Sequence, residues 1–150
     1  KSKSLDEGIE EAIRILKSGK AFEKFIQIVK AQNGNTDFIS HPEKYPKSKF
    51  REVIKANSTG FLSEVNTYDL GMAAIDLGAG RKTKDDKIDP KAGIIFNCKI
   101  GDAINKGVVL AELFSDFKSG IDSAKKRIAN AIKISKSKPQ KPKLIKTIIN

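Results

Sequence analysis

The sequence has 150 residues, the length of one domain, and its 29 Lys and Arg outnumber its 18 Asp and Glu, which leaves a formal net charge of +11. Only four of the basic residues are Arg, the side chain suited to bidentate recognition of phosphates and bases, so no specific nucleic acid is expected as a partner. No apolar run approaches the roughly 18 residues of a membrane span. The single Cys excludes an internal disulfide and favours a cytoplasmic location.

The first part of the chain predicts two consecutive helices. Ser4 and Glu7 form a capping-box pattern, and apolar residues then recur at helical spacing as far as Gly19. The same spacing returns and stops at Gly34, which predicts a helical hairpin whose apolar stripes something else must cover. The sequence begins at Lys1, directly before the helix signal, which suggests a piece of a longer chain.

The apolar pattern then changes from helical to alternating. Residues 35–49 are polar, carry two prolines and predict a loop in which His41 is a surface residue without a nearby acidic partner. From residue 50 the period is two, which predicts strands over 50–56 and 60–65 joined by a short polar turn.

A short helix beginning after Asn66 is the element around which the rest of the chain is organised. Asn66 is a candidate N-cap, and Gly78 and Gly80 are expected to end the helix with positive φ angles. These glycines follow the helix, whereas glycines that bind phosphate precede one, so a phosphate loop is disfavoured. The apolar face of the helix consists of Leu70, Ala73, Ala74 and Leu77.

Residues 82–91 are rich in Lys and Asp and predict an exposed loop. Asp85, Asp86 and Asp89 are candidates for acid–base or metal chemistry, but the lysines between them favour a charge-balanced, solvated segment. The serines have no recognisable basic partner and the His is single. No catalytic residue and no metal site are therefore expected in this chain.

The C-terminal half predicts more strands and one more helix. Alternating apolar residues predict a strand over 94–100, and two Gly-containing turns lead into another over 108–114. The last helix has Ser119 as its candidate N-cap and an apolar stripe that ends at Ile132. A final edge strand is predicted over 144–149.

The order of the elements predicts an α+β fold. We expect three parts: a helical hairpin and loop over 1–46, a domain over 47–134, and a basic, Pro-containing tail over 135–150.

Short motifs, in order along nearly the whole chain, point to a known family. They are Ser18 to Ala21 with Phe25, Ala31 to Phe38, Gly60 and Phe61, Asp69 to Ala73, Leu77 to Arg81, Ile88 and Asp89, Gly93, Gly101 and Asp102, and Lys106 and Gly107. Together they resemble the C-terminal part of thymidine and pyrimidine-nucleoside phosphorylases, and residues 35–38 are most similar to the thymidine phosphorylase branch. The resemblance implies an α/β-hammerhead domain with a barrel-sandwich core.

The resemblance also implies an activity for the parent protein. That family is a group of pentosyltransferases, homodimeric and without a cofactor, that cleave thymidine with inorganic phosphate to thymine and 2-deoxyribose 1-phosphate. The motifs that bind phosphate and base lie in the N-terminal part of the family's enzymes. This chain is therefore expected to be inactive alone, to contribute lobe structure and part of the cleft wall, and to have that N-terminal part as its partner.

Four residues after the central helix are candidates for a loop that closes the cleft: Gly80, Arg81, Lys82 and Lys84. Held only at its ends and without apolar anchors, this loop is expected to be mobile. The alternative interpretation of the whole chain is a stand-alone Lys-rich binding module for RNA or another anionic partner.

Overall fold

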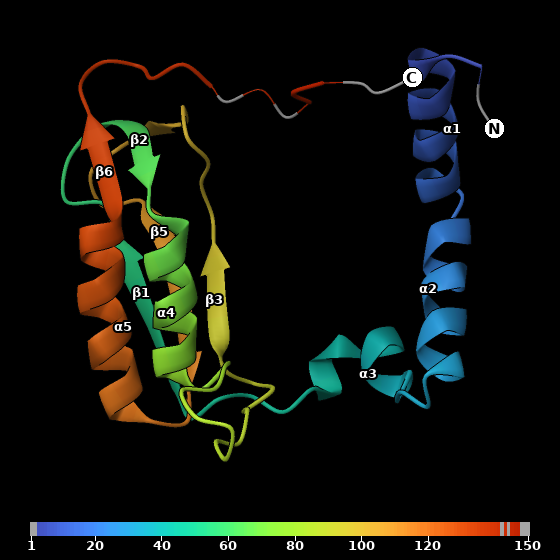
Figure 1. Cartoon of the computed structure of the whole chain (residues 1–150), viewed down its shortest axis with the longest axis horizontal. Helices are drawn as coiled ribbons and strands as arrows, with labels where there is room; N and C mark the ends of the chain where they lie inside the picture. The colour runs from blue at the N-terminus through green and yellow to red at the C-terminus, as the bar shows by residue number, and fades with distance from the viewer. Residues whose placement is uncertain (1–2, 142, 144, 148–150) are drawn as a thin grey trace. The chain divides into compact units, whose positions relative to one another are not determined.

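The computed structural model describes residues 3–141, 143 and 145–147, and the chain divides into two compact units, Lys1–Pro46 and Lys47–Asn150. The first unit contains α1 (Leu5–Lys17), α2 (Lys20–Ala31), α3 (Asp37–Ser40) and the single-turn 3₁₀ helix η1 (Pro42–Lys44). The second contains β1 (Phe50–Lys55), β2 (Gly60–Val65), α4 (Thr67–Leu77), β3 (Gly93–Phe96), β4 (Ala103–Ile104), β5 (Val109–Ser115), α5 (Lys118–Ala131) and β6 (Ile132–Ser135) (Figure 1). The expected α+β class is confirmed.

The two helices expected at the start of the chain are confirmed. The Ser4 side chain accepts a hydrogen bond from the Glu7 amide at 3.2 Å, and Gly19 has a φ of 80° between the helices. Figure 1 shows α1 and α2 end to end rather than packed side by side as in a hairpin, so neither covers the apolar stripe of the other. Seven large apolar side chains are exposed as a result: Leu5, Ile9, Ile13, Leu16, Phe22, Phe25 and Ile28.

The segment expected to be a loop over 35–49 contains two single turns, α3 and η1. The Asn35 side chain accepts a hydrogen bond from the Asp37 amide at 2.8 Å, which starts α3, and Pro42 is the first residue of η1. Such turns lack the length that apolar periodicity needs, which is why the sequence pattern missed them.

Two antiparallel three-stranded sheets, with strand orders β1-β5-β3 and β4-β2-β6, form the second unit. The strands β1 and β2 are consecutive in sequence but belong to different sheets. Phe50 of β1 lies opposite Ser115 of β5, and Val65 of β2 lies opposite Ile132 of β6. Each early strand is therefore completed by a strand from the far end of the chain.

The helix α4 begins and ends largely as its sequence predicts. The Asn66 side chain accepts a hydrogen bond from the Asp69 amide at 3.2 Å, and Gly78, with a φ of 102°, is the left-handed C-cap. The expectation of a positive φ at Gly80 is wrong. Gly80 is required instead by close packing, because a Cβ there would lie 2.7 Å from Cγ1 of Ile75.

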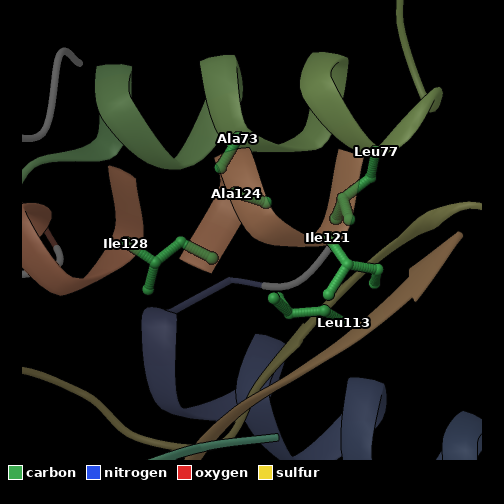
Figure 2. Close-up of a cluster of buried hydrophobic side chains, with 6 residues drawn as sticks. All are labelled: Ala73, Leu77, Leu113, Ile121, Ala124 and Ile128. Carbon is green, nitrogen blue, oxygen red and sulfur yellow. The ribbon is translucent and has the colours of Figure 1, made fainter. Parts of the chain in front are cut away.

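The main core lies where α4 and α5 pack against each other and against the β1-β5-β3 sheet (Figure 2). Gly120 allows the two helices to approach closely, because a Cβ at this position would lie 2.5 Å from the Asp76 carbonyl oxygen. Six side chains, each 0% exposed, make up this core: Ala73, Leu77, Leu113, Ile121, Ala124 and Ile128. A second cluster, Ala56, Leu62, Ile104 and Leu110, lies beside the other sheet.

Both ends of α5 differ from the sequence prediction. Phe117 is the N-cap and Ser119 makes no capping hydrogen bond. The start of α5 is held instead by the buried hydroxyl of Ser115. This hydroxyl accepts a hydrogen bond from the Phe117 amide at 3.0 Å and donates one to the Leu77 carbonyl at 2.7 Å. At the other end, Ile132 begins strand β6 rather than extending the helix.

The predicted strand over 94–100 is also shorter in the structure, since β3 ends at Phe96. After it, the Asp102 carboxylate accepts a hydrogen bond from the Lys99 amide at 2.8 Å, which turns the chain. The predicted strand over 144–149 includes residues outside those described, and the hammerhead topology and the three-part division stay predictions. Within the described part of the chain, no helix combines the length and apolar composition of a membrane crossing.

Candidate functional site

The loop that follows α4 is fixed by side chains at several points, not only at its ends. The Asp86 carboxylate accepts hydrogen bonds from the backbone amides of Lys82 and Thr83, at 2.8 and 3.0 Å, and from the Thr83 hydroxyl at 2.8 Å. These three bonds lower the pKa of Asp86, those from Thr83 having the largest effect. Asp86 is therefore a structural residue of this loop and not a free, solvated charge.

The end of the loop is fastened to the sheet through a partly buried charge cluster. The Asp89 amide donates to the Gly78 carbonyl at 2.9 Å, and the Asp89 carboxylate accepts from the Lys91 amide at 3.0 Å. The Lys91 ammonium pairs with Asp116, and Asp116 also accepts a hydrogen bond from the Lys49 amide at 2.9 Å. These contacts, led by that of Lys91, lower the pKa of Asp116.

The four residues expected to close a cleft fall into different environments. Lys82 is committed to an ion pair, since its ammonium lies 2.8 Å from the Asp76 carboxylate. Gly80 is packed against Ile75. Arg81 and Lys84 are exposed, and their side chains have no ion pair or hydrogen bond with any residue that the structure describes. These two cations remain available to an external ligand.

Asp76, in the last turn of α4, is the most buried carboxylate near this loop, with a side chain only 6% exposed. Arg127 of α5 donates from Nε to Oδ2 of this carboxylate at 3.0 Å, whereas Lys82 contacts Oδ1. Burial raises the pKa of Asp76, but the hydrogen bonds and charges of Lys82 and Arg127 outweigh that effect and hold the pKa below its ordinary value. The three residues line an open hollow of about 570 Å³ with Asp69, Ser123, Lys126 and Asn130.

Acid is expected to destabilise the second unit partly through Asp76. Because the pKa of this carboxyl is lower in the folded state, its stabilising contribution is complete above the unfolded-state pKa and is lost as the pH falls below about 4. Asp76→Asn should therefore lower the free energy of unfolding by about 2 kcal/mol at neutral pH. The difference from the parent should shrink toward acid pH.

Urea titrations at a series of pH values measure this effect. Asp85→Asn is the matched control, because Asp85 is exposed and lies in the neighbouring loop. Its stability should follow that of the parent at every pH. A constant difference between Asp76→Asn and the parent down to about pH 2 would contradict the assigned ionisation.

Two other residues singled out in the sequence have structural surroundings. His41 was expected to lack an acidic partner, but its Nδ1 lies 3.5 Å from Glu43 and its Nε2 lies 3.9 Å from Asp37, all on exposed side chains. The Cys98 thiol is half-buried beside Leu110, and burial raises its pKa, which disfavours the reactive thiolate. Among the described residues, no His, Cys, Asp or Glu side chains gather in a group that could hold a metal ion.

Comparison with known proteins places these features in a family. The profile of the pyrimidine nucleoside phosphorylase C-terminal domain matches residues 61–135, which is half of the chain. The chain belongs to this family. The matched segment runs from β2 to the end of β6, so the pyrimidine nucleoside phosphorylase C-terminal domain contains both the loop after α4 and the Asp76 cluster.

Full-length relatives of this domain show how much of an enzyme the chain represents. It is 35% identical over 149 residues to the pyrimidine-nucleoside phosphorylase of Bacillus subtilis, an alignment that covers 99% of the chain and 34% of the relative. The corresponding enzyme of Staphylococcus epidermidis is 37% identical over 146 residues, covering 97% and 33%. That of Staphylococcus aureus is 36% identical over 135 residues, covering 90% and 31%.

The chain thus spans about a third of the length of these curated relatives. The family resemblance expected from the sequence motifs is confirmed. The alternative interpretation, a stand-alone Lys-rich module that binds RNA, has no support from these matches.

Proposed function

We propose that the chain is the C-terminal portion of a cytoplasmic, homodimeric phosphorylase that cleaves pyrimidine nucleosides, thymidine among them. Inorganic phosphate is the co-substrate, no cofactor takes part, and the products from thymidine are thymine and 2-deoxyribose 1-phosphate. The observation that carries the proposal is the alignment of 99% of the chain with an enzyme named pyrimidine-nucleoside phosphorylase. The test is phosphate-dependent release of thymine or uracil by the longer protein, made by joining the chain to its upstream sequence.

The chain's own part in the reaction is to support one wall of the substrate cleft. We propose that the preceding part of the enzyme supplies the reacting groups, because the family resemblance places the motifs that bind phosphate and base there. The exposed apolar stripe of α1 and α2 is the surface that we expect the preceding part of the same enzyme to cover, because an apolar patch of this extent marks an interaction site.

The loop after α4 is the part of the chain that we propose to act at the cleft. Arg81 and Lys84 present positive charge without a partner in the described structure. A guanidinium binds an oxyanion through two parallel hydrogen bonds, and such a contact strengthens when closure excludes water. Closure of the enzyme would bring Arg81 to bound phosphate or to an acidic group of the opposite wall.

Arg81→Ala in the longer protein is expected to lower kcat/KM by about tenfold, because one charge-assisted contact made in the closed state is lost. The unfolding midpoint should stay unchanged, since the Arg81 side chain is exposed. Steady-state kinetics with thymidine and phosphate, together with thermal unfolding, measure the two effects.

Lys87→Ala is the matched control for this substitution. It removes one cation from the same loop, from an exposed side chain without a partner in the described structure. Its kinetics should equal those of the parent. Parental kinetics in Arg81→Ala would mean that the loop only connects two elements.

A further inference from the structure

Asp76 occupies a position where a carboxylate is intrinsically unfavourable. It lies in the last turn of α4, at the negative end of the helix dipole, and its side chain is 6% exposed. Two cations offset the unfavourable helix dipole and the burial of this charge. Lys82 Nζ lies 2.8 Å and Arg127 Nε 3.0 Å from the Asp76 carboxylate oxygens. Asp76 thus joins helix α5 to the loop that follows α4.

The partner of Asp76 on the loop is the residue next to Arg81. Two contacts fix Lys82. Its ammonium forms an ion pair with Asp76, and its backbone amide donates a hydrogen bond to the Asp86 carboxylate at 2.8 Å. On the other side of Arg81, Gly80 packs so closely against Ile75 that a Cβ would lie 2.7 Å from Cγ1 of that residue. The backbone of Arg81 is therefore fixed on both sides, whereas its side chain is exposed.

We propose that Asp76 is a positioning residue that acts through Lys82 to hold the backbone of Arg81 in place for an incoming oxyanion. The inference rests on the proposed function of the loop and deepens it. It also removes Lys82 from the residues that meet the ligand, because the Lys82 ammonium is already paired with the Asp76 carboxylate. Of the four residues first considered, Arg81 and Lys84 remain as exposed cations that can meet the ligand.

The reason for holding Arg81 in advance is entropic and geometric. An oxyanion contact made by a fixed backbone loses less conformational freedom on closure than one made by a loose loop. A misplacement of about 1 Å near a reacting group can lower a rate by about a hundredfold. Releasing Lys82 should therefore affect catalysis although Lys82 never touches the substrate.

The test combines a measurement on the loop with one on catalysis. In the 150-residue chain, hydrogen exchange of the Lys82 and Thr83 amides reports how firmly the loop is held. In the longer protein, kcat and KM for phosphate and for thymidine are measured. The variants are Lys82→Met, Lys82→Arg and Asp76→Asn, with the double variant Asp76→Asn and Lys82→Met.

Lys82→Met is expected to speed exchange of these amides and to lower kcat/KM for phosphate, each by about tenfold. Lys82→Arg should keep amide exchange and kcat/KM for phosphate close to the parental values, because the new side chain still places a cation near Asp76. The double variant should be no worse than the more affected of its single variants, because the two residues act through one contact. Lys82 is 60% exposed, so Lys82→Met keeps the test available even if Asp76→Asn unfolds.

Arg127→Met is the matched control, because it removes the other partner of Asp76 and leaves Lys82 in place. It should lower the unfolding midpoint while amide exchange in the loop and the ratio kcat/KM stay parental. The kinetics of Lys82→Met also distinguish the two possible oxyanions. If only the KM for phosphate rises, the oxyanion is phosphate. If kcat falls while both KM values stay unchanged, the oxyanion is a protein carboxylate. Both results support a positioning role.

Two outcomes overturn the proposal, and they can be told apart. If Arg81→Ala lowers kcat/KM but Lys82→Met leaves both exchange and kinetics parental, the loop acts at the cleft and Asp76 does not position it. If Arg81→Ala itself has parental kinetics, the proposed function of the loop is wrong, and the positioning role of Asp76 fails with it.

Discussion

Leu77→Asp is expected to lower the free energy of unfolding of the second unit by about 4 kcal/mol, enough to unfold a marginally stable domain. Leu77 is 0% exposed and packs among Leu113, Ile121 and the other members of the main core. The new carboxylate would lose its hydration and leave a cavity where the apolar side chain had been. No cation belongs to the set of residues that make up this core.

Urea unfolding followed by circular dichroism measures the effect. Tyr68→Asp is a suitable control, because Tyr68 lies on the same helix but is 73% exposed. A carboxylate there is in the first turn, where the helix dipole favours it, so stability should change by less than about 0.5 kcal/mol. Equal unfolding midpoints for the two variants would mean that the buried face of α4 is misassigned.

The second large effect concerns activity. The 150-residue chain alone is expected to release no thymine from thymidine and phosphate, whereas the longer protein should do so. The family resemblance places the motifs that bind phosphate and base upstream of this chain, and the curated relatives are about three times as long. Chromatographic detection of free thymine, with and without phosphate, distinguishes the two proteins.

The control for this experiment is the separately expressed upstream part. Added to the chain, it should restore some release of thymine if the two parts associate through the apolar stripe of α1 and α2. Release of thymine by the chain alone, at a rate comparable with that of the longer protein, would contradict the proposal that the upstream part supplies the reacting groups.

Elements specified by local chemistry were predictable from the sequence. The caps at Ser4 and Asn66 and the left-handed Gly78 depend on residues within one helical turn, and the structure confirms all three. The pairing of strands was not predictable, because Phe50 meets Ser115 across most of the second unit. Local patterns identify a strand by its alternation but contain no information about its partner.

The candidate site shows the same limit. The composition of the loop was sufficient to identify Arg81 and Lys84 as exposed cations. Lys82 looked equivalent to them, and only the fold brings Asp76 to it together with Arg127, which is 51 residues away from Asp76. The ion pair of Asp76 with Lys82, rather than with another lysine of the loop, depends on the tertiary structure, so sequence spacing cannot identify it.

The pairing of early strands with late ones has a consequence for synthesis of the protein. β1 and β2 leave the ribosome well before β5 and β6, the strands that complete their sheets. During that interval the apolar side chains of both strands lack their final partners, and such long-range pairing is intrinsically slow. Chaperone binding to the nascent chain should therefore be strongest after residue 65 has emerged and should end once residue 135 is free to pair.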